Sequence, residues 1–302
     1  MPGLLNEGDW NLLLRRIKKG KCTAFLGAGA AFGVLPLGAD IAQEWAKQHR
    51  FPLPECSDLA KVAQYLAVTE DFMSPKERIA ERIEHIAPPN FKETDEPHAI
   101  LADLPLPVYI TTNYDDFMVQ ALKNRNRDPK QELCRWNKYI SEEPSVFEPG
   151  RAYVPTVANP LVFHLHGAYR VPESLVLTED DYLDFIVNVS RDQLVIPTQI
   201  QKALIGTSLL FLGYRIADWD FRVLFRSLVG YMERSTAKAH VSVQLLPLSG
   251  HYTDEQKSQA QDYLDRYFSK LDIRVYWGSC REFAAELRKR WDDFKDKPAE
   301  GN

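Results

Sequence analysis

The residues best suited to chemistry follow four short apolar segments, at the point where each segment ends. They supply amide, carboxylate, imidazole and phenol groups, and glycines that expose the backbone. The endings are Gly27-Ala28-Gly29-Ala30, Thr112-Asn113-Tyr114-Asp115, His166-Gly167 and Gly213-Tyr214. Ligands of open parallel sheets bind at the carboxyl ends of strands. The four endings therefore predict one shared site.

The first ending is a turn of small residues, from Gly27 to Ala30. Such a turn lets the backbone approach a phosphate, with the following amides available as donors. The spacing is not a clean G-x-G-x-x-G, and no Gly-Lys-Ser/Thr follows, which excludes a P-loop. The alternative is a tight strand-to-helix connection that binds no ligand.

The second ending carries Thr112, Asn113 and Asp115. A carboxamide can fix a ribose hydroxyl or a water molecule, and a carboxylate can recognise an amide or stabilise positive charge. The alternative is that Asn113 or Asp115 caps the helix that follows, because both residue types are favoured at helix starts.

The third ending carries two histidines, His164 and His166, which are two residues apart and therefore on one face of a strand. They could chelate a metal, but no third or fourth ligand is evident nearby. We assign a general acid or base role to His166, because it ends the strand and histidine titrates near neutral pH. His164 lies deeper and is expected to be a hydrogen-bonded core residue.

The fourth ending is Gly213-Tyr214, where the glycine permits close approach of a nucleotide. Asp218 and Asp220 follow, and either could instead cap a helix that begins near Phe221. Gly206 and the two residues after it precede the strand, so we interpret them as a helix stop.

Strands and helices alternate along the chain, which predicts an α/β fold: a Rossmann-like parallel sheet with helices on both faces, plus a helical subdomain and insertions. The expected strands are Cys22–Leu26, Val108–Ile110, Leu161–Leu165, Leu209–Leu212, His240–Leu246 and Ile273–Trp277. The expected helices are Trp10–Ile17 capped by Asp9, one opening at Ile41–Ala46, the stretch 57–90, Tyr114–Leu122, Asp181–Val189 after a capping box at Thr178, Ile196–Leu204, Phe221–Met232, Thr253–Lys270 and Arg281–Phe294.

We interpret residues 1–294 as a single domain, followed by a frayed tail at 295–302. The Rossmann-like core is expected at about 9–35, 100–122, 158–170 and 203–294. A helical small subdomain is expected at about 36–99, with insertions at about 123–157 and 171–202.

Composition excludes several classes of protein. The 302 residues carry a formal net charge of -5, which disfavours direct binding to nucleic acid. The longest apolar runs are far too short to span a membrane, and the N-terminus lacks a secretory pattern, so we expect a cytoplasmic protein. The cysteines contain no C-x-x-C pair, which disfavours zinc; they are Cys22, Cys56, Cys134 and Cys280.

The four endings, in this order, resemble the sirtuin superfamily, and more closely its prokaryotic SIR2-like branch. The resemblance covers most of the chain and is supported by the segment from Leu177 to Tyr182. It implies that the glycine turn holds the phosphates of NAD, with Gly213 and Tyr214 also at the cofactor. It implies that Asn113 and His166 are the catalytic pair, and that Asp115 lies near the nicotinamide end, beside Thr112.

The chain also departs from classical sirtuin deacylases. It cannot build their four-cysteine zinc module, and Pro36-Leu37-Gly38-Ala39-Asp40 stands where they carry a segment with Asp-Phe-Arg. Both departures disfavour protein deacylation. The SIR2-like branch without zinc is associated with NAD hydrolysis in bacterial anti-phage defence. The resemblance therefore implies an NAD+ glycohydrolase with NAD+ as substrate and no zinc.

Two other functions stay open at this point. One is a non-catalytic module that binds NAD or ADP-ribose and signals to a partner; the other is an NAD-dependent deacylase. An enzyme that destroys NAD would poison its host, so we expect its activity to be gated. The expected gate is a homo-oligomer, a partner defence protein, or both.

Overall fold

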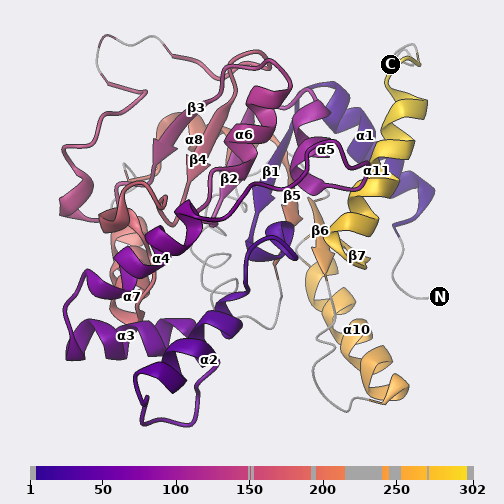
Figure 1. The fold of residues 1–302 in the computed structure, drawn as a ribbon. Coiled ribbons are helices and arrows are strands. Elements are labelled where there is room, and N and C mark those ends of the chain that lie inside the picture. The colour runs from indigo at the N-terminus through magenta and orange to yellow at the C-terminus, as the bar shows by residue number, and fades with distance from the viewer. Residues whose placement is uncertain are drawn as a thin grey trace.

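The computed structural model describes residues 5–148, 150, 153–191, 195–214, 240–244, 253–270 and 272–297. Within these residues the centre is a seven-stranded sheet with the order β3-β4-β2-β1-β5-β6-β7, and every neighbouring pair is parallel (Figure 1). The predicted α/β class with a Rossmann-like parallel sheet is confirmed.

The strands fall close to their predicted positions. They are β1 (Cys22–Leu26), β2 (Val108–Thr111), β3 (Lys130–Leu133), β4 (Leu161–His164), β5 (Ser208–Leu212), β6 (His240–Gln244) and β7 (Ile273–Trp277). Every residue of β1, β2, β4 and β5 is buried, as expected for parallel strands covered on both faces. Strand β3 was not among the expected strands, because we interpreted residues 123–157 as an insertion into the core that holds the main sheet. It is an edge strand of that sheet, with Lys130 opposite Leu161.

Along the chain, the helices of the described residues precede, connect and follow the strands. They are α1 (Glu7–Lys18), α2 (Gly38–Gln48), α3 (Leu59–Thr69), α4 (Ser74–Glu84), α5 (Pro97–Asp103), α6 (Phe117–Asn124), α7 (Glu179–Arg191), α8 (Thr198–Gly206), α10 (Asp254–Ser269) and α11 (Cys280–Phe294). Short 3₁₀ turns occur at η1 (Ala28–Ala31), η2 (Lys138–Ile140) and η3 (Pro172–Ser174). The predicted helix Phe221–Met232, together with Asp218 and Asp220, lies outside the described residues.

Three helix predictions need correction. Asn6, not Asp9, caps α1: the Asp9 amide donates to Asn6 Oδ1 at 2.9 Å, and Asp9 completes the capping box from inside the first turn. The stretch 57–90 is not helical throughout, because α3 ends at Thr69 and α4 begins at Ser74. Helix α6 begins at Phe117 rather than Tyr114, since residues 112–116 belong to the loop after β2.

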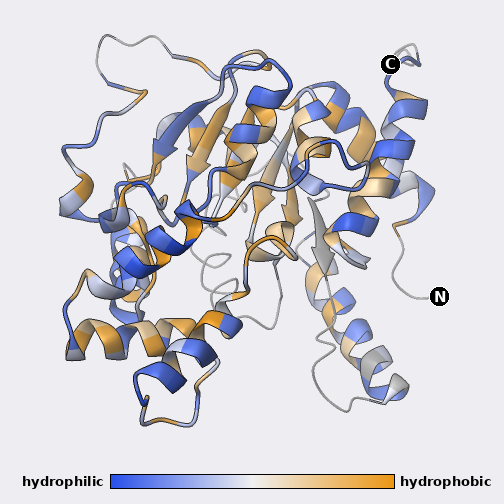
Figure 2. Cartoon of the chain, in the orientation of Figure 1, coloured by the Kyte–Doolittle hydropathy of each residue, from blue (hydrophilic) through white to orange (hydrophobic). Residues whose placement is uncertain are grey.

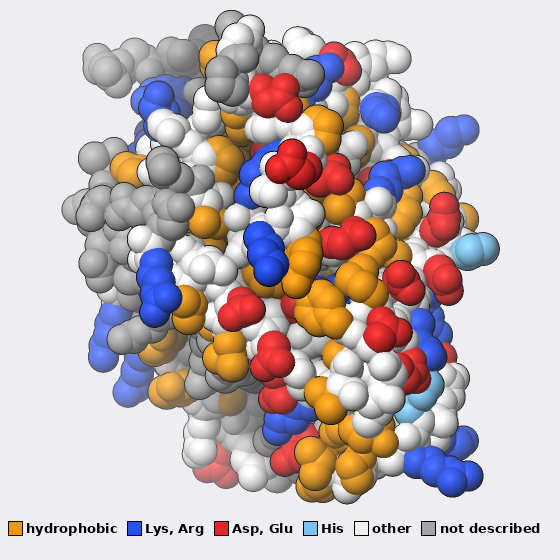
Figure 3. All heavy atoms as spheres, turned by 90° about the vertical axis from the view of Figure 1, so that its left-hand side faces the viewer, with side chains coloured by type: hydrophobic (Ala, Val, Ile, Leu, Met, Phe, Trp, Pro, Cys, Tyr) orange, Lys and Arg blue, Asp and Glu red, His pale blue; other side chains and the backbone are white. Residues whose placement is uncertain are grey.

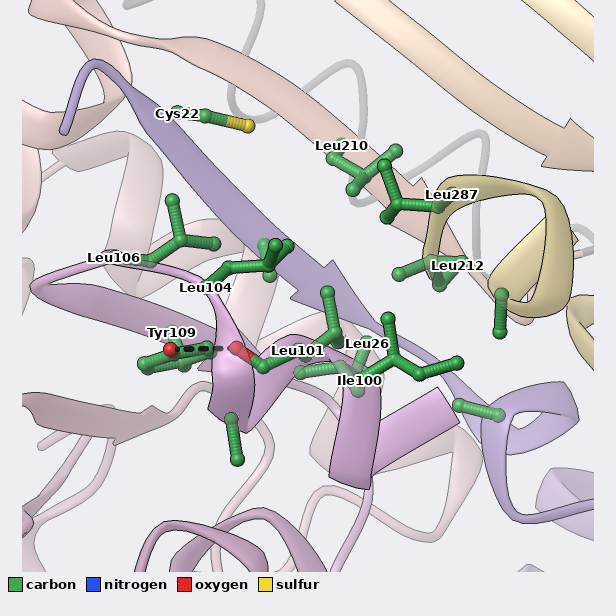
Figure 4. Close-up of a cluster of buried hydrophobic side chains, with 14 of the residues drawn as sticks. Cys22, Leu26, Ile100, Leu101, Leu104, Leu106, Tyr109, Leu210, Leu212 and Leu287 are labelled. Carbon is green, nitrogen blue, oxygen red and sulfur yellow. Dashed lines mark hydrogen bonds between the residues drawn. The ribbon is translucent and has the colours of Figure 1, made fainter. Parts of the chain in front are cut away.

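Helices cover both faces of the sheet. Helices α1, α5, α6 and α11 share one apolar core with the sheet, and α7, α8 and α10 share another. Successive strand residues alternate between these cores, so Leu26 lies in the first and Phe25 in the second. In Figure 2 the central strands β1 and β5 have hydrophobic colours, whereas the edge strand β3 is hydrophilic. Figure 4 shows the first core, where Tyr109 donates a hydrogen bond of 3.0 Å to the Leu101 carbonyl.

Helices α2, α3 and α4 share a third core, which includes two residues that follow β4 in the chain. Those residues, Leu175 and Leu177, pack with Trp45, Val62 and Ile79. The segment after β4 is therefore held against the three helices. They lie together at one end of the molecule (Figure 1).

The face of the molecule at the left-hand side of Figure 1 carries charges of both signs. Figure 3 shows acidic and basic side chains interspersed with apolar ones, rather than a continuous basic track. Among the described helices, none has both the length and the apolar character needed to cross a membrane.

Candidate functional site

The four strand ends selected from the sequence are contiguous in the sheet. Thr111 of β2 pairs with His164 of β4 on one side and with Leu26 of β1 on the other. Leu26 in turn pairs with Leu212 of β5. The chain runs from β1 toward β2 and β4, and later from β5 toward β6 and β7, so the strand order reverses between β1 and β5. Open α/β sheets bind ligands at this switch point.

The glycine turn is interlocked with the end of β5. The amide of Gly27 donates to the Leu212 carbonyl at 2.8 Å, and the amide of Gly29 donates to the Gly213 carbonyl at 2.9 Å. The Ala30 amide donates to the Gly27 carbonyl at 2.9 Å. The chain itself uses these three amides, so they are not available as donors to a phosphate.

The close contact explains why glycine stands at these positions. A Cβ on Gly213 would lie 2.3 Å from the Ala30 nitrogen, and its φ of +81° is in the left-handed region. A Cβ on Gly29 would lie 2.9 Å from the Gly213 Cα. The glycines therefore let two strand ends approach each other, whatever ligand lies above them.

Tyr214 ties three strand ends together rather than standing free. Its hydroxyl donates to the Leu26 carbonyl at 2.7 Å and lies 2.9 Å from Thr112 Oγ1. The ring packs beside Gly27, where a Cβ would approach it to 2.8 Å, and edge-on to Phe25. Thr112 and Tyr214 thus fix the spacing of β1, β2 and β5.

Asn113 lies two residues after the end of β2 and is 9% exposed. Its amide donates to Thr111 Oγ1 at 2.9 Å, which holds the backbone of the loop. Within the described part of the chain, its carboxamide takes no part in capping α6. The group is therefore left for a ligand or a water molecule.

Asp115 is buried, and its two carboxylate oxygens differ. Oδ1 accepts a hydrogen bond of 2.9 Å from the Phe117 amide, the first amide of α6, while the N-cap position of this helix belongs to Asp116 rather than to Asp115. Oδ2 is buried and has no hydrogen-bond partner among the described residues. Burial raises the pKa of Asp115, and the nearby His98 offsets only part of this effect. The neutral acid is therefore favoured.

His166 lies in the turn after β4, not within the strand, because β4 ends at His164. The expectation that both histidines project from one strand face therefore does not apply. The His166 ring packs edge-on against Tyr182 and Phe185 of α7, with centroids 5.6 and 5.0 Å away. Its Nε2 is buried without a hydrogen-bond partner among the described residues.

The aromatic surroundings of His166 decide its charge. Burial lowers the pKa of its imidazole to about 3, so the ring is neutral at physiological pH. Our near-neutral expectation is wrong for this structure, because Tyr182 and Phe185 exclude water from the ring. A neutral imidazole remains able to accept a proton.

His164 is a core residue, as predicted, but its expected hydrogen bonds are not found. Both of its ring nitrogens are buried and lack a partner in the part of the chain that the structure describes. Burial lowers the pKa of His164 to about 4, and the Asn113 backbone offsets part of this shift. Across the described ranges, no three His, Cys, Asp or Glu side chains are grouped as metal ligands.

The structure also shows site residues that the sequence analysis missed. The segment Ser174–Thr178 crosses beside His166, and the amide of Val176 donates to the His166 carbonyl at 3.0 Å. Buried Lys76 on α4 reaches this segment. One signal was present in the sequence: Lys76 interrupts the apolar face of α4, between Met73 and the buried Ile79 and Ala80. Glu96 and His98, hydrogen-bonded at 2.7 Å, lie behind Asp115.

Comparison with known proteins gives consistent similarities. The chain is 22% identical to the NAD(+) hydrolase ThsA of Acinetobacter baumannii (strain 532279), over 92% of this chain and 55% of that protein. It is 22% identical to ThsA of Enterococcus faecium, over 88% of this chain and 53% of that protein. It is 26% identical to ThsA of Cytobacillus dafuensis, over 70% of this chain and 38% of that protein. The chain thus spans about half the length of the first two relatives.

A family model supplies the assignment. The model of the SIR2-like domain matches residues 107–275, which is more than half of the chain. The matched region contains Asn113, Asp115, His166 and Gly213, whereas the glycine turn after β1 lies before it. The expected resemblance is confirmed, and this chain belongs to the SIR2-like domain family.

Proposed function

We propose that this chain is an NAD+ glycohydrolase, which cleaves NAD+ to nicotinamide and ADP-ribose. The observation that carries the proposal is the position of Asn113 and His166. They follow β2 and β4, which are adjacent and in register, two residues beyond the Thr111–His164 pair. The named activity of the ThsA relatives supports the same reaction.

The reaction breaks the bond between the nicotinamide nitrogen and C1′ of the ribose, and water adds to C1′. The transition state resembles an oxocarbenium ion, so catalysis requires a fixed ribose and a positioned water. In the proposed mechanism, the Asn113 carboxamide orients the ribose or the water. Neutral His166 accepts the proton that water loses and then releases it to solvent.

Asp115 acts at the leaving group in this proposal. Burial favours its protonated form. A protonated carboxyl can donate a hydrogen bond to the nicotinamide carboxamide, which stabilises that group as it leaves. Oδ2, which has no partner among the described residues, is the oxygen assigned to this bond.

We assign the phosphates and the adenosine to the strand ends at the switch point. Gly27, Ala28, Gly29 and Ala30 present backbone without bulky side chains, and Gly213 lies against them. Thr112 and Tyr214 hold the neighbouring strand ends in place. Because amides of Gly27, Gly29 and Ala30 bond within the chain, close van der Waals approach is their contribution to binding.

The wider setting is also a proposal. We infer a gated cytoplasmic effector of anti-phage defence, in which residues 1–294 form one domain. Its activity is switched by self-assembly, by a partner defence protein, or by both. Light scattering combined with activity measurements tests the gate. A constitutively active monomer would contradict it.

The direct test is incubation of the purified chain with NAD+, with and without its co-expressed genetic neighbours. Nicotinamide and ADP-ribose are measured by chromatography, and both are expected in equal amounts. Tight nucleotide binding without nicotinamide release in either condition would identify a binding module instead. Formation of O-acetyl-ADP-ribose from an acetylated peptide would identify a deacylase.

A further inference from the structure

Lys76 is a lysine in an unusual environment. Its side chain is fully buried on α4, and Nζ donates to the Leu175 carbonyl at 2.9 Å and to Asp181 Oδ1 at 2.7 Å. The ammonium also lies over the rings of Phe72 and Trp136, at 4.4 and 5.5 Å from their centroids. Burial lowers the pKa of Lys76, and the Asp181 carboxylate opposes this. The desolvation of buried charges can offset their attraction, so a buried ion pair often adds little net stability. The presence of this pair therefore calls for another explanation.

The partners of Lys76 fix a short segment, Ser174–Thr178, which we call the strap. Asp181 Oδ2 accepts the amides of Leu177 and Thr178, at 3.1 and 2.9 Å. The indole of Trp136 donates to the Ser174 carbonyl at 2.8 Å. Lys76 binds the carbonyl of Leu175, which lies between the residues bound by Trp136 and by Asp181. The strap is therefore fixed along its whole length by side chains from α4, α7 and the loop after β3.

The other edge of the strap contacts the backbone of His166 and the side chain of Tyr114, the residue after Asn113. The Val176 amide donates to the His166 carbonyl at 3.0 Å. The hydroxyl of Tyr114, which follows Asn113 in the chain, donates to the Val176 carbonyl at 2.6 Å. A Cβ on Gly167 would lie 2.2 Å from the Ser174 carbonyl oxygen, so the turn after His166 packs directly on the strap.

We propose that Lys76 and Asp181 are positioning residues for the active site. Their ion pair fixes the strap, and the strap sets the relative position of the loops that carry Asn113 and His166. The proposal deepens the proposed function and rests on it. It assigns a role in turnover to α4, a helix with no residue at the strand ends.

The test compares three variants for nicotinamide release and for stability. Lys76→Met removes the ammonium and keeps most of the stem. The double variant Lys76→Met/Asp181→Asn also removes the carboxylate charge, while the Asn oxygen still accepts the strap amides. Arg82→Met is the matched control, because Arg82 is also on α4 and pairs with Glu44 at the surface.

The expected result is a fall in kcat of about 10- to 100-fold for Lys76→Met, because small misplacements of catalytic groups have effects of this size. KM for NAD+ is expected to change less than about threefold, since the groups assigned to the phosphates and the adenosine follow β1 and β5. The double variant recovers the thermal stability that Lys76→Met loses, but its kcat stays low. Arg82→Met retains the thermal stability and the kcat of the wild type. A double variant or Lys76→Met with wild-type kcat per folded molecule would overturn the proposal.

Amide hydrogen exchange supplies a second readout that does not depend on the reaction. If the ion pair fixes the strap, exchange at Val176 becomes faster in the double variant and stays unchanged in Arg82→Met. Unchanged exchange at Val176 would overturn the positioning role even if the wild type hydrolyses NAD+. If the wild type releases no nicotinamide, the proposed function fails, while the exchange result still decides whether the strap depends on Lys76.

Discussion

At the scale of single residues, the environment of His166 defines its chemistry. The ring packs edge-on against Tyr182 and Phe185 of α7, and burial keeps the imidazole neutral. The ring is therefore unprotonated over the whole physiological range, and the low pKa also makes it a weaker base than a solvated imidazole. Buried Asp115 is shifted in the complementary direction, toward its protonated form. Burial thus holds the imidazole unprotonated and shifts the carboxyl group toward its protonated form.

The first prediction concerns the pH dependence of turnover. Because burial lowers the pKa of His166 to about 3, the basic form is present throughout pH 5–8. We expect kcat/KM for NAD+ to show no inflection near pH 6.5. Initial rates of nicotinamide release across this range provide the measurement. Activity that is lost below an inflection at pH 6–7 would show that His166 is solvated in the working enzyme.

The second prediction concerns stability in acid. The pKa of His164 is about 4 in the folded chain, below its usual value of 6.5, so the unfolded chain binds more protons between these values. Stability is therefore lost as the pH falls from 6.5 to 4. His164→Phe should reduce this slope by about 1.4 kcal/mol per pH unit. Urea unfolding at several pH values measures the free energy of unfolding. An equal dependence on pH in the wild type and in His164→Phe would refute the burial argument.

At the scale of elements, the site depends on how closely the strand ends approach. The glycine turn after β1 and Gly213 after β5 touch through their backbones, and Tyr214 seals the contact. The strap fixes the loops after β2 and β4 in a comparable way. Both halves of the site are therefore held by backbone contacts and by one tyrosine hydroxyl each, from Tyr214 and from Tyr114.

The third prediction tests the contact between β1 and β5. Gly213→Ala adds a Cβ 2.3 Å from the Ala30 nitrogen at a φ of +81°, and should lower the free energy of unfolding by about 2–5 kcal/mol. Gly33→Ala is the matched control. Gly33 also has a positive φ, +87°, but nothing lies within 4 Å of the added Cβ. The control should lose only about 1 kcal/mol. Equal losses in denaturant unfolding would mean that the close contact is unimportant.

At the scale of the whole molecule, the main sheet could be predicted because its central strands are continuous apolar runs. Edge strand β3 was misplaced, since Lys130, Gln131 and Glu132 carry no apolar signal and only pairing with β4 makes them a strand. Helix α5 was not expected because it is short and begins at Pro97.

The candidate site likewise has some features that could be predicted from the sequence and others that could not. The positions of Asn113 and His166 could be predicted, because polar residues after parallel strands meet at one edge of the sheet. The charge state of His166 could not, because Tyr182 and Phe185 approach it only in the folded chain. The use of the turn amides by β5 and the reach of Lys76 to the strap are likewise tertiary contacts between distant segments.

The central claim is that Asn113 and His166 together cleave NAD+, and the most direct test is the rate of nicotinamide release by Asn113→Ala and His166→Ala. The matched controls are Asn11→Ala and His85→Ala, because Asn11 and His85 are exposed and remote in sequence from the strand ends. Each site variant should lose at least about 100-fold in rate while remaining folded by circular dichroism, and the controls should not change. Full turnover by both site variants would contradict the proposed mechanism.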